Sequence, residues 1–162
     1  MKNRFISVTL LTLISLSSLY ANDIENTIIP TKHSKTLTLS SIAEIQPGLG
    51  TVMMEFGHRF YLTYYAAKAE NWELAEYEIE ELIEAQEIAE TTRPKYALKL
   101  QAFESIYLKK LQNSIRKQDW KLFEKNYTQT TNACNACHKE NGHSYIQYSL
   151  PKESPKYLKM AL

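Results

Sequence analysis

The sequence predicts an all-α fold, an antiparallel four-helix bundle with an extended C-terminal tail. After the turn at residues 47–50, apolar residues recur at steps of three and four in four successive segments, which is the period of amphipathic α-helices. The segments are separated by short breaks, and helices joined by short connections pack side by side in opposite directions. The chain of 162 residues has four Gly and five Pro, so long stretches lack helix breakers.

The first two helices are expected over residues 49–70 and 72–90. Asn71 suits the N-cap of the second helix. Eight glutamates occupy most of its outer surface. The apolar stripe of the first helix holds Leu49, Val52, Met53, Phe56, Phe60, Thr63, Tyr64 and Ala67, and that of the second holds Ala75, Ile79, Leu82, Ile83 and Gln86.

The third helix is expected to begin after Pro94 and the fourth near Asp119, a good N-cap. Residues 93–125 carry nine basic and three acidic side chains, so this part of the chain would complement the acidic second helix. The alternative is that the glutamates of the second helix face solvent and pair with no other helix. The third stripe holds Tyr96, Leu100, Phe103, Tyr107, Leu111 and Ile115, and the fourth holds Trp120, Phe123, Tyr127, Thr130, Cys134 and His138.

The termini predict an exported protein. Residues 1–21 have the anatomy of a secretory signal peptide, because Lys2 and Arg4 precede an apolar run that ends before Ala21. A membrane anchor is the alternative, but the run is short for a bilayer span of about 20 residues. Residues 22–47 are expected as a polar N-terminal arm, 48–150 as the helical domain and 151–162 as a loose C-terminal tail. Loss of Lys2 and Arg4 changes the formal net charge from +1 to −1, which leaves no strongly basic surface for nucleic acid.

The candidate functional site is the sequence Cys134-Asn135-Ala136-Cys137-His138. The spacing C-x-x-C-H supplies two thiols for the two vinyl groups of one porphyrin and an imidazole for its iron. On a helix, steps of three and four residues place Cys134, Cys137 and His138 on one face, here the predicted inner face. We therefore expect one covalent haem c, with His138 as an axial iron ligand.

Two other uses of the cysteines remain open. One is a redox C-x-x-C of the thioredoxin type, although that motif belongs beside a βαβ pattern, which this sequence lacks. The other is a zinc site formed by Cys134, Cys137, His138 and His143. Adjacent Cys137 and His138 make poor tetrahedral partners, and the usual second pair of ligands is missing.

A C-x-x-C-H motif near the end of the last of four helices resembles class II cytochromes c, the cytochrome c-prime type, whereas class I proteins carry the motif near the N-terminus. The chain is also similar to a group of small exported monohaem proteins over residues 55–151. That similarity rests on residues 57–60 (GHRF), 71–75 (NWELA), Asp119-Trp120 with Phe123, the haem motif, and 145–151 (YIQYSLP). Cytochromes c-prime usually end soon after the haem histidine, whereas this chain continues with a segment able to cover a haem edge.

The resemblance directs attention to the sixth iron ligand. In c-prime proteins that position is apolar and vacant, while in their electron-transfer relatives a Met from the first helix fills it. Met53 lies on the apolar stripe of the first helix and is the expected ligand. Met54 and His58 are the alternates on a neighbouring face, and a vacant position is the remaining option. Met53 also suits ordinary core packing.

These observations predict a soluble periplasmic monohaem c-type cytochrome that transfers single electrons and docks transiently on redox partner proteins. Met ligation of a His-bound c-haem raises its reduction potential, which favours that role. We expect no nucleic-acid partner, no membrane span after signal cleavage, and no enzymatic activity, because the sequence shows no nucleophile–base pair. The alternatives are a gas-binding or sensing haem protein with an open sixth site, and a small zinc or redox-thiol module.

Overall fold

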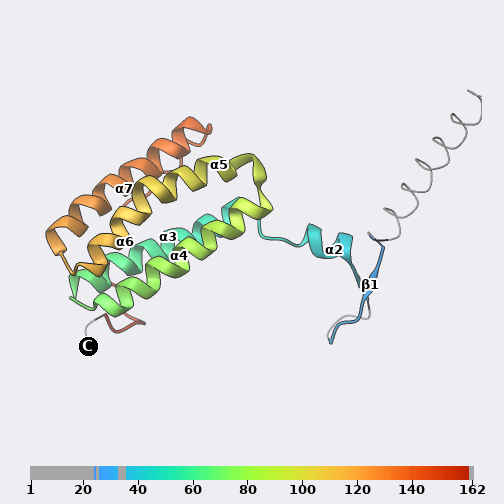
Figure 1. Ribbon diagram of the computed structural model, residues 1–162, viewed down its shortest axis with the longest axis horizontal. Helices are drawn as coiled ribbons and strands as arrows, with labels where there is room; N and C mark the ends of the chain where they lie inside the picture. Colours follow the sequence, from blue (N-terminus) through green and yellow to red (C-terminus); the bar gives the residue numbers. More distant parts are fainter. Residues whose placement is uncertain (1–23, 25, 33–35, 161–162) are drawn as a thin grey trace, which may run out of the picture. The chain divides into compact units, whose positions relative to one another are not determined.

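The structure, a computed structural model, describes residues 24, 26–32 and 36–160. The predicted signal peptide lies outside these residues. The described chain is mostly helical with one two-stranded sheet, which confirms the all-α class (Figure 1). It divides into two compact units, residues 1–46 and 47–162. Within the described residues, no helix combines the length and the apolar character that crossing a membrane requires.

The described residues of the N-terminal unit form three short elements. Strands β1 (Ile28–Ile29) and β2 (Leu37–Thr38) pair antiparallel, with Ile28 opposite Thr38 and Ile29 opposite Leu37. Helix α2 (Leu39–Glu44) follows directly, and the Thr38 hydroxyl caps it by accepting from the Ser41 backbone N–H at 3.1 Å. The polar arm predicted at residues 22–47 therefore contains regular structure where Ile, Leu and Thr favour strands.

The second unit holds the four predicted helical stretches. They are α3 (Leu49–Lys68), α4 (Trp72–Thr92), a third stretch made of α5 (Pro94–Phe103), a π-turn η1 (Glu104–Leu108) and α6 (Lys109–Arg116), and α7 (Trp120–Glu140). Helix α3 packs along α4, α6 contacts both α4 and α7, and α7 contacts α3 (Figure 1). The first and last stretches are therefore neighbours in space.

The predicted helix starts are confirmed by their caps. The Asn71 side chain accepts from the Leu74 N–H at 3.1 Å, and the Asp119 side chain accepts from the Leu122 N–H at 2.9 Å. Each bond satisfies an N–H group that has no partner within its helix. Pro94 occupies the first position of α5, where its missing N–H costs nothing.

The π-turn changes which residues of the third stretch are buried. A π-turn places one extra residue in the helix and so rotates everything after it by about 100°. Leu108, Leu111 and Ile115 are completely buried, whereas Tyr107, expected on the inner stripe, is half-buried. Tyr107 thus lies at the edge of the inner stripe, beside the completely buried Leu108.

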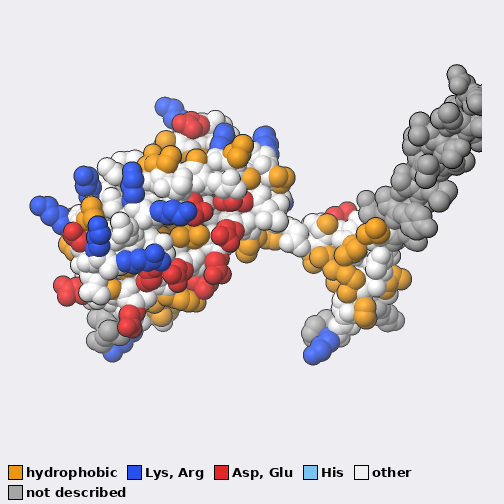
Figure 2. Space-filling model, viewed as in Figure 1, with side chains coloured by type: hydrophobic (Ala, Val, Ile, Leu, Met, Phe, Trp, Pro, Cys, Tyr) orange, Lys and Arg blue, Asp and Glu red, His pale blue; other side chains and the backbone are white. Residues whose placement is uncertain are grey.

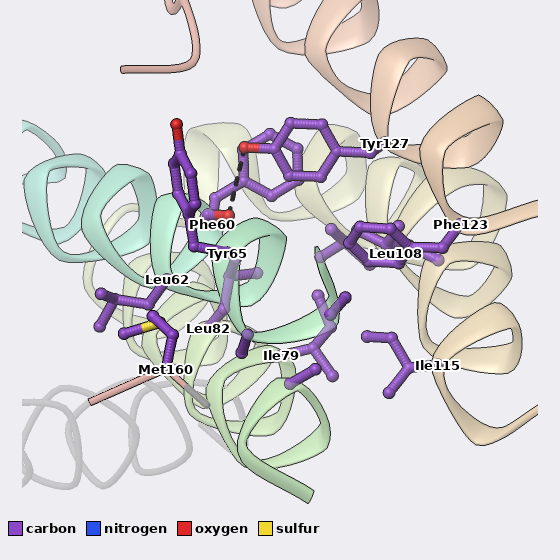
Figure 3. Packing of buried hydrophobic residues seen from close by; sticks show 14 of the residues in the cluster. Phe60, Leu62, Tyr65, Ile79, Leu82, Leu108, Ile115, Phe123, Tyr127 and Met160 are labelled. Carbon is purple, nitrogen blue, oxygen red and sulfur yellow. Dashed lines mark hydrogen bonds between the residues drawn. The ribbon is translucent and has the colours of Figure 1, made fainter. Parts of the chain in front are cut away.

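The core of this unit is apolar and aromatic. The rings of Phe60 and Tyr127 stack with their centroids 4.0 Å apart, side by side in Figure 3. The Tyr127 hydroxyl donates to the Phe60 carbonyl at 3.2 Å, so the one polar atom of this ring is satisfied. Each fully buried Leu, Ile or Phe contributes roughly 1.5–3 kcal/mol of transfer free energy. The largest such apolar side chains are Phe60, Phe123, Ile79, Leu82, Leu108, Leu111 and Ile115.

Ion pairs link the acidic α4 to its neighbours. Arg116 of α6 pairs with Glu76 at 2.7 Å, which confirms one contact between the predicted basic and acidic surfaces. Arg59 of α3 pairs with the buried Glu78 at 2.9 Å. Other glutamates of α4, such as Glu84 and Glu87, are exposed. Figure 2 shows basic side chains beside a band of acidic ones, so part of the glutamate run pairs and part is solvated.

The C-terminal segment packs on α3 instead of forming a loose tail. In the described part of the C-terminus, residues 141–160 form no helix or strand. The Tyr65 hydroxyl donates to the Pro151 carbonyl at 2.8 Å, and the Tyr61 hydroxyl donates to the Glu153 carbonyl at 2.7 Å. Met160 is buried in the core cluster. Tyr61 and Tyr65 of α3 thus supply hydrogen-bond donors to a segment without secondary structure.

Candidate functional site

Helix α7 positions the residues of the C-x-x-C-H motif. Cys134, Cys137 and His138 lie in its last two turns, at the spacing that places side chains on one face. All three side chains are half-buried, and both cysteines are free thiols. Cys134 packs against the core cluster that contains Phe60 and Tyr127. The structure therefore places the three predicted site residues at one-turn spacing near the end of α7, with Cys134 against the core.

The two thiols are neutral at pH 7. Burial raises the pKa of Cys134 to about 12, because the charged thiolate loses its hydration. Burial also raises the pKa of Cys137, and the positive charge of Lys99 opposes that shift. A redox C-x-x-C of the thioredoxin type works through a thiolate whose pKa is lowered. The surroundings of Cys134 and Cys137 favour the opposite state.

The ring of His138 is oriented by the backbone of the following segment. Its Nδ1 atom lies 3.0 Å from the carbonyl oxygen of Ile146. A carbonyl oxygen only accepts, so Nδ1 carries the proton and donates it. The lone pair of the neutral ring is therefore on Nε2, the nitrogen on the far side from this bond. An imidazole in this tautomer is prepared to bind a metal through Nε2.

A glycine turn carries the chain from α7 back along the helix. Gly142 has φ +82°, a left-handed conformation that glycine adopts without a Cβ penalty. Its N–H donates to the Lys139 carbonyl at 3.2 Å, and the His143 N–H donates to the His138 carbonyl at 2.8 Å. This turn reverses the chain so that Ile146 and Tyr148 lie alongside the motif.

Asn135, one of the two residues between the cysteines, bonds this returning segment. Its Oδ1 accepts from the Tyr148 N–H at 2.7 Å, and its Nδ2 donates to the Tyr148 carbonyl at 3.1 Å. The Tyr148 hydroxyl lies 2.9 Å from the hydroxyl of Tyr127. The sequence analysis missed Asn135 and Tyr148 as site residues. The similarity over residues 145–151 was the available indication that this segment belongs to the site.

The Tyr148 ring lies over Gly57 on the α3 side. A Cβ atom at Gly57 would lie 4.0 Å from two carbons of the Tyr148 ring, so the ring rests directly on this part of the helix. The rings of Tyr148 and Phe60 are 5.2 Å apart between centroids. Tyr148 thus bridges α7 and α3 beside the motif.

The candidates for the sixth ligand differ in exposure. Met53 is half-buried on α3, whereas Met54 is 77% exposed. His58 is exposed, and its Nε2 lies 2.9 Å from the hydroxyl of Tyr157, against which its ring also stacks. Met53 is the one of the three that combines partial burial with the predicted inner stripe. Arg59 is engaged by Glu55 and Glu78.

The side chain of His143 does not join the other three residues of the alternative zinc site. It is exposed, and its Nδ1 lies 3.0 Å from the hydroxyl of Tyr145. Among the residues that the structure describes, no three His, Cys, Asp or Glu side chains converge as a metal site would require. One histidine and two thiols on α7 are the donors that the motif offers.

Aromatic side chains of α3 and α5 pack against one another, with Phe56 buried and Phe103 half-buried. Phe56 of α3 and Phe103 of α5 meet edge-on at 6.0 Å, and Phe103 lies 5.4 Å from Tyr107. In α5, where the structure describes every residue, none is buried. In α7, also fully described, the buried residues end at Thr130, one turn before Cys134. Phe103 and Tyr107 are therefore partly exposed aromatic side chains of the third stretch.

Comparison of the chain with models of protein families, with characterised proteins and with solved structures finds no match.

Proposed function

We propose that this protein is a periplasmic monohaem c-type cytochrome that transfers single electrons. One haem c would be bound through thioethers to Cys134 and Cys137, with His138 as an axial ligand. The observation that carries the proposal is the pairing of two free thiols with an adjacent imidazole whose Nδ1 is already hydrogen-bonded to Ile146. That arrangement matches what the C-x-x-C-H spacing requires.

The residues at the site fit a haem. The thiols are neutral and half-buried, and the free imidazole nitrogen is Nε2. When bound, the haem would supply a reversible one-electron couple at its iron. The protein would set the axial ligands, the hydrogen bonds to them and the exposure of the haem.

The helix order and the place of the motif support a class II, cytochrome c-prime-like protein. We propose that α3, α4, the third stretch and α7 form an antiparallel four-helix bundle, since each stretch contacts its neighbours and connections are short. The basic n-region and apolar run at residues 1–21 support export with cleavage near Ala21. Transient redox partner proteins follow from the electron-transfer role.

Intact mass tests this proposal directly. The chain is expressed with the c-haem maturation machinery, exported, and extracted with acidic acetone, which removes haem that is not covalently bound. The expected mass is that of the chain from near Asn22 plus one haem. A Cys134→Ser, Cys137→Ser double variant is the matched control and should have the bare polypeptide mass. The bare mass in the wild-type protein would reject the proposal and favour a zinc or redox-thiol module.

We further propose Met53 as the sixth ligand, supported by its half-burial on the inner stripe of α3. The ferric protein should then show a weak near-infrared band of the Met-to-iron type. Met53→Ala should abolish the band and open the iron to carbon monoxide. Met54→Ala is the control and should change neither, because Met54 is 77% exposed. A high-spin wild-type protein that binds carbon monoxide readily would instead support the gas-binding alternative.

A further inference from the structure

We propose that Asn135 is a positioning residue that acts through the C-terminal segment: by bonding Tyr148, it holds the Ile146 carbonyl on Nδ1 of His138. This inference rests on the proposed function, because His138 is taken as an iron ligand. It assigns a role to a residue inside the motif whose identity the C-x-x-C-H pattern leaves open. Two independent pairs of contacts support this inference, one on each side of the C-terminal segment.

The first pair of contacts fixes the segment at two points along α7. Asn135 engages both backbone polar groups of Tyr148, at 2.7 Å and 3.1 Å, as a neighbouring strand would. His138, one helical turn later, engages the carbonyl of Ile146, two residues earlier. The segment therefore runs antiparallel to the helix.

The spacing of the two contacts agrees with elementary geometry. Three residues of helix advance roughly 4.5 Å and two extended residues roughly 6.6 Å, so a short antiparallel segment can keep both contacts at once. Carbonyls two residues apart in an extended chain point to the same side. Ile146 and Tyr148 thus both present their oxygens to α7, and fixing Tyr148 fixes the direction of the Ile146 carbonyl.

The second pair of contacts anchors Tyr148 in the core. Tyr127 donates its hydroxyl proton to the Phe60 carbonyl at 3.2 Å, so the Tyr148 hydroxyl is the donor in the 2.9 Å bond to Tyr127. The Tyr148 ring also lies over Gly57 and packs against the Phe60 ring of α3. The side chain of Tyr148 is therefore held by the core, while its backbone is held by Asn135.

A fixed hydrogen bond at Nδ1 has two consequences for a ligand that binds through Nε2. It keeps the ring orientation and the tautomer, and it increases the basicity of Nε2. A more basic imidazole stabilises the oxidised iron more than the reduced iron. Loss of the bond should therefore raise the reduction potential of the bound haem and expose the Nδ1 proton to solvent.

The test uses the haem-loaded full chain and compares Asn135→Ala with Asn132→Ala. Asn132 is exposed and lies one turn earlier on the same helix, so it serves as the control. Two quantities are measured: the hydrogen-exchange rate of the His138 Nδ1 proton by NMR, and the reduction potential by redox titration. Asn135→Ala should speed exchange at least about 10-fold and raise the potential, whereas Asn132→Ala should leave both at the wild-type values.

Two further variants separate positioning from general stability. Asn135→Asp can accept from the Tyr148 N–H but cannot donate to its carbonyl, so its exchange rate should lie between wild type and Asn135→Ala. If Asn135→Ala does not accumulate, Asn135→Asp is compared with the wild type in its place. Tyr127→Phe removes the core bond of Tyr148 and should lower the melting temperature, while Asn135 still holds the Tyr148 backbone and keeps exchange within about 3-fold of wild type.

The outcomes distinguish the two proposals. A haem-bearing Asn135→Ala protein that melts lower but keeps the wild-type exchange rate and potential would overturn the positioning role alone. A wild-type chain without covalent haem would overturn the proposed function and the positioning role together. Equal changes in Asn132→Ala and Asn135→Ala would also overturn the positioning role, because they would show a general effect of changing α7.

Discussion

The two halves of α7 are built differently, although they belong to one continuous helix. The first half, residues 120–130, contributes Phe123, Asn126, Tyr127 and Thr130, all of them buried. In the second half, residues 131–140, all of them described, none is buried. The third stretch has the same asymmetry: α6 buries Leu111, Ser114 and Ile115, while α5, described in full, buries none.

The two regions also use different interactions. The first half packs against the core through aromatic rings. The ring centroids of Tyr64 and Trp120 are 5.6 Å apart, and those of Phe60 and Tyr127 are 4.0 Å apart. The second is organised by hydrogen bonds to the returning chain, from Asn135 and His138. Stability is thus concentrated in one half of the helix, and the chemistry of the motif is placed in the other, where packing is looser. The predictions below test this separation.

The largest expected effect is the loss of iron ligation in His138→Ala. His138 lies beside the second cysteine with its Nδ1 bonded to Ile146, whereas His143 is exposed and pairs with Tyr145. Optical spectra of the loaded protein should show a displaced Soret band and altered spin state in His138→Ala and a wild-type spectrum in His143→Ala. Equal disruption by the two substitutions would show that the proximal ligand is misassigned.

A second comparison separates stability from the site. Phe123 is completely buried in the first half of α7, so Phe123→Ala should lower the free energy of unfolding by about 3–5 kcal/mol. Phe103 is half-buried beside Phe56 and Tyr107, so Phe103→Ala should cost less than half as much but change the haem spectrum more.

Urea unfolding of the haem-loaded variants, followed by far-ultraviolet circular dichroism, measures the first quantity, and the Soret and visible bands measure the second. If Phe103→Ala were the more destabilising substitution and left the spectrum unchanged, the two halves would not be separated in the way that the burial pattern indicates.

Periodicity and capping residues predicted much of the fold. The starts of α4 and α7 follow from Asn71 and Asp119, because a side-chain acceptor at the N-cap is a local feature. The π-turn at residues 104–108 could not be predicted, since its extra residue is decided by packing against α4 and α7 and not by the local sequence.

The position of the C-x-x-C-H motif on the last helix was predicted from the sequence. The steps between Cys134, Cys137 and His138 are local, so a helix brings them together wherever it packs. The contribution of Tyr148 depends on a reversal at Gly142 and on contacts with α3, Gly57 among them, far away in sequence. Long-range contacts of an irregular segment leave no periodic pattern. For the same reason, the packing of Tyr61 and Tyr65 against residues 151–153 was not expected.

The smallest expected effect comes from two turns, one at each end of α7. Gln118 has φ +53° just before the helix, a left-handed conformation that costs a residue with a Cβ about 1–2 kcal/mol. Gln118→Gly should remove that strain, and part of the gain is offset because glycine increases the entropy of the unfolded chain. The expected result is about 0.5–1 kcal/mol more stability with an unchanged haem spectrum. Lys117→Gly is the matched control, since φ is −80° there and glycine should destabilise.

Gly142→Ala makes the opposite change at the other end. No atom lies within 4 Å of the added Cβ, so the cost of about 1–2 kcal/mol comes from φ +82° alone. Because this turn directs Ile146 to His138, Gly142→Ala should also speed exchange of the Nδ1 proton, which Gln118→Gly should leave unchanged. Urea unfolding and NMR of both variants check this pair of outcomes. Faster exchange in Gln118→Gly, or wild-type exchange in Gly142→Ala despite its lower stability, would show that the two ends of α7 are not independent in the way proposed here.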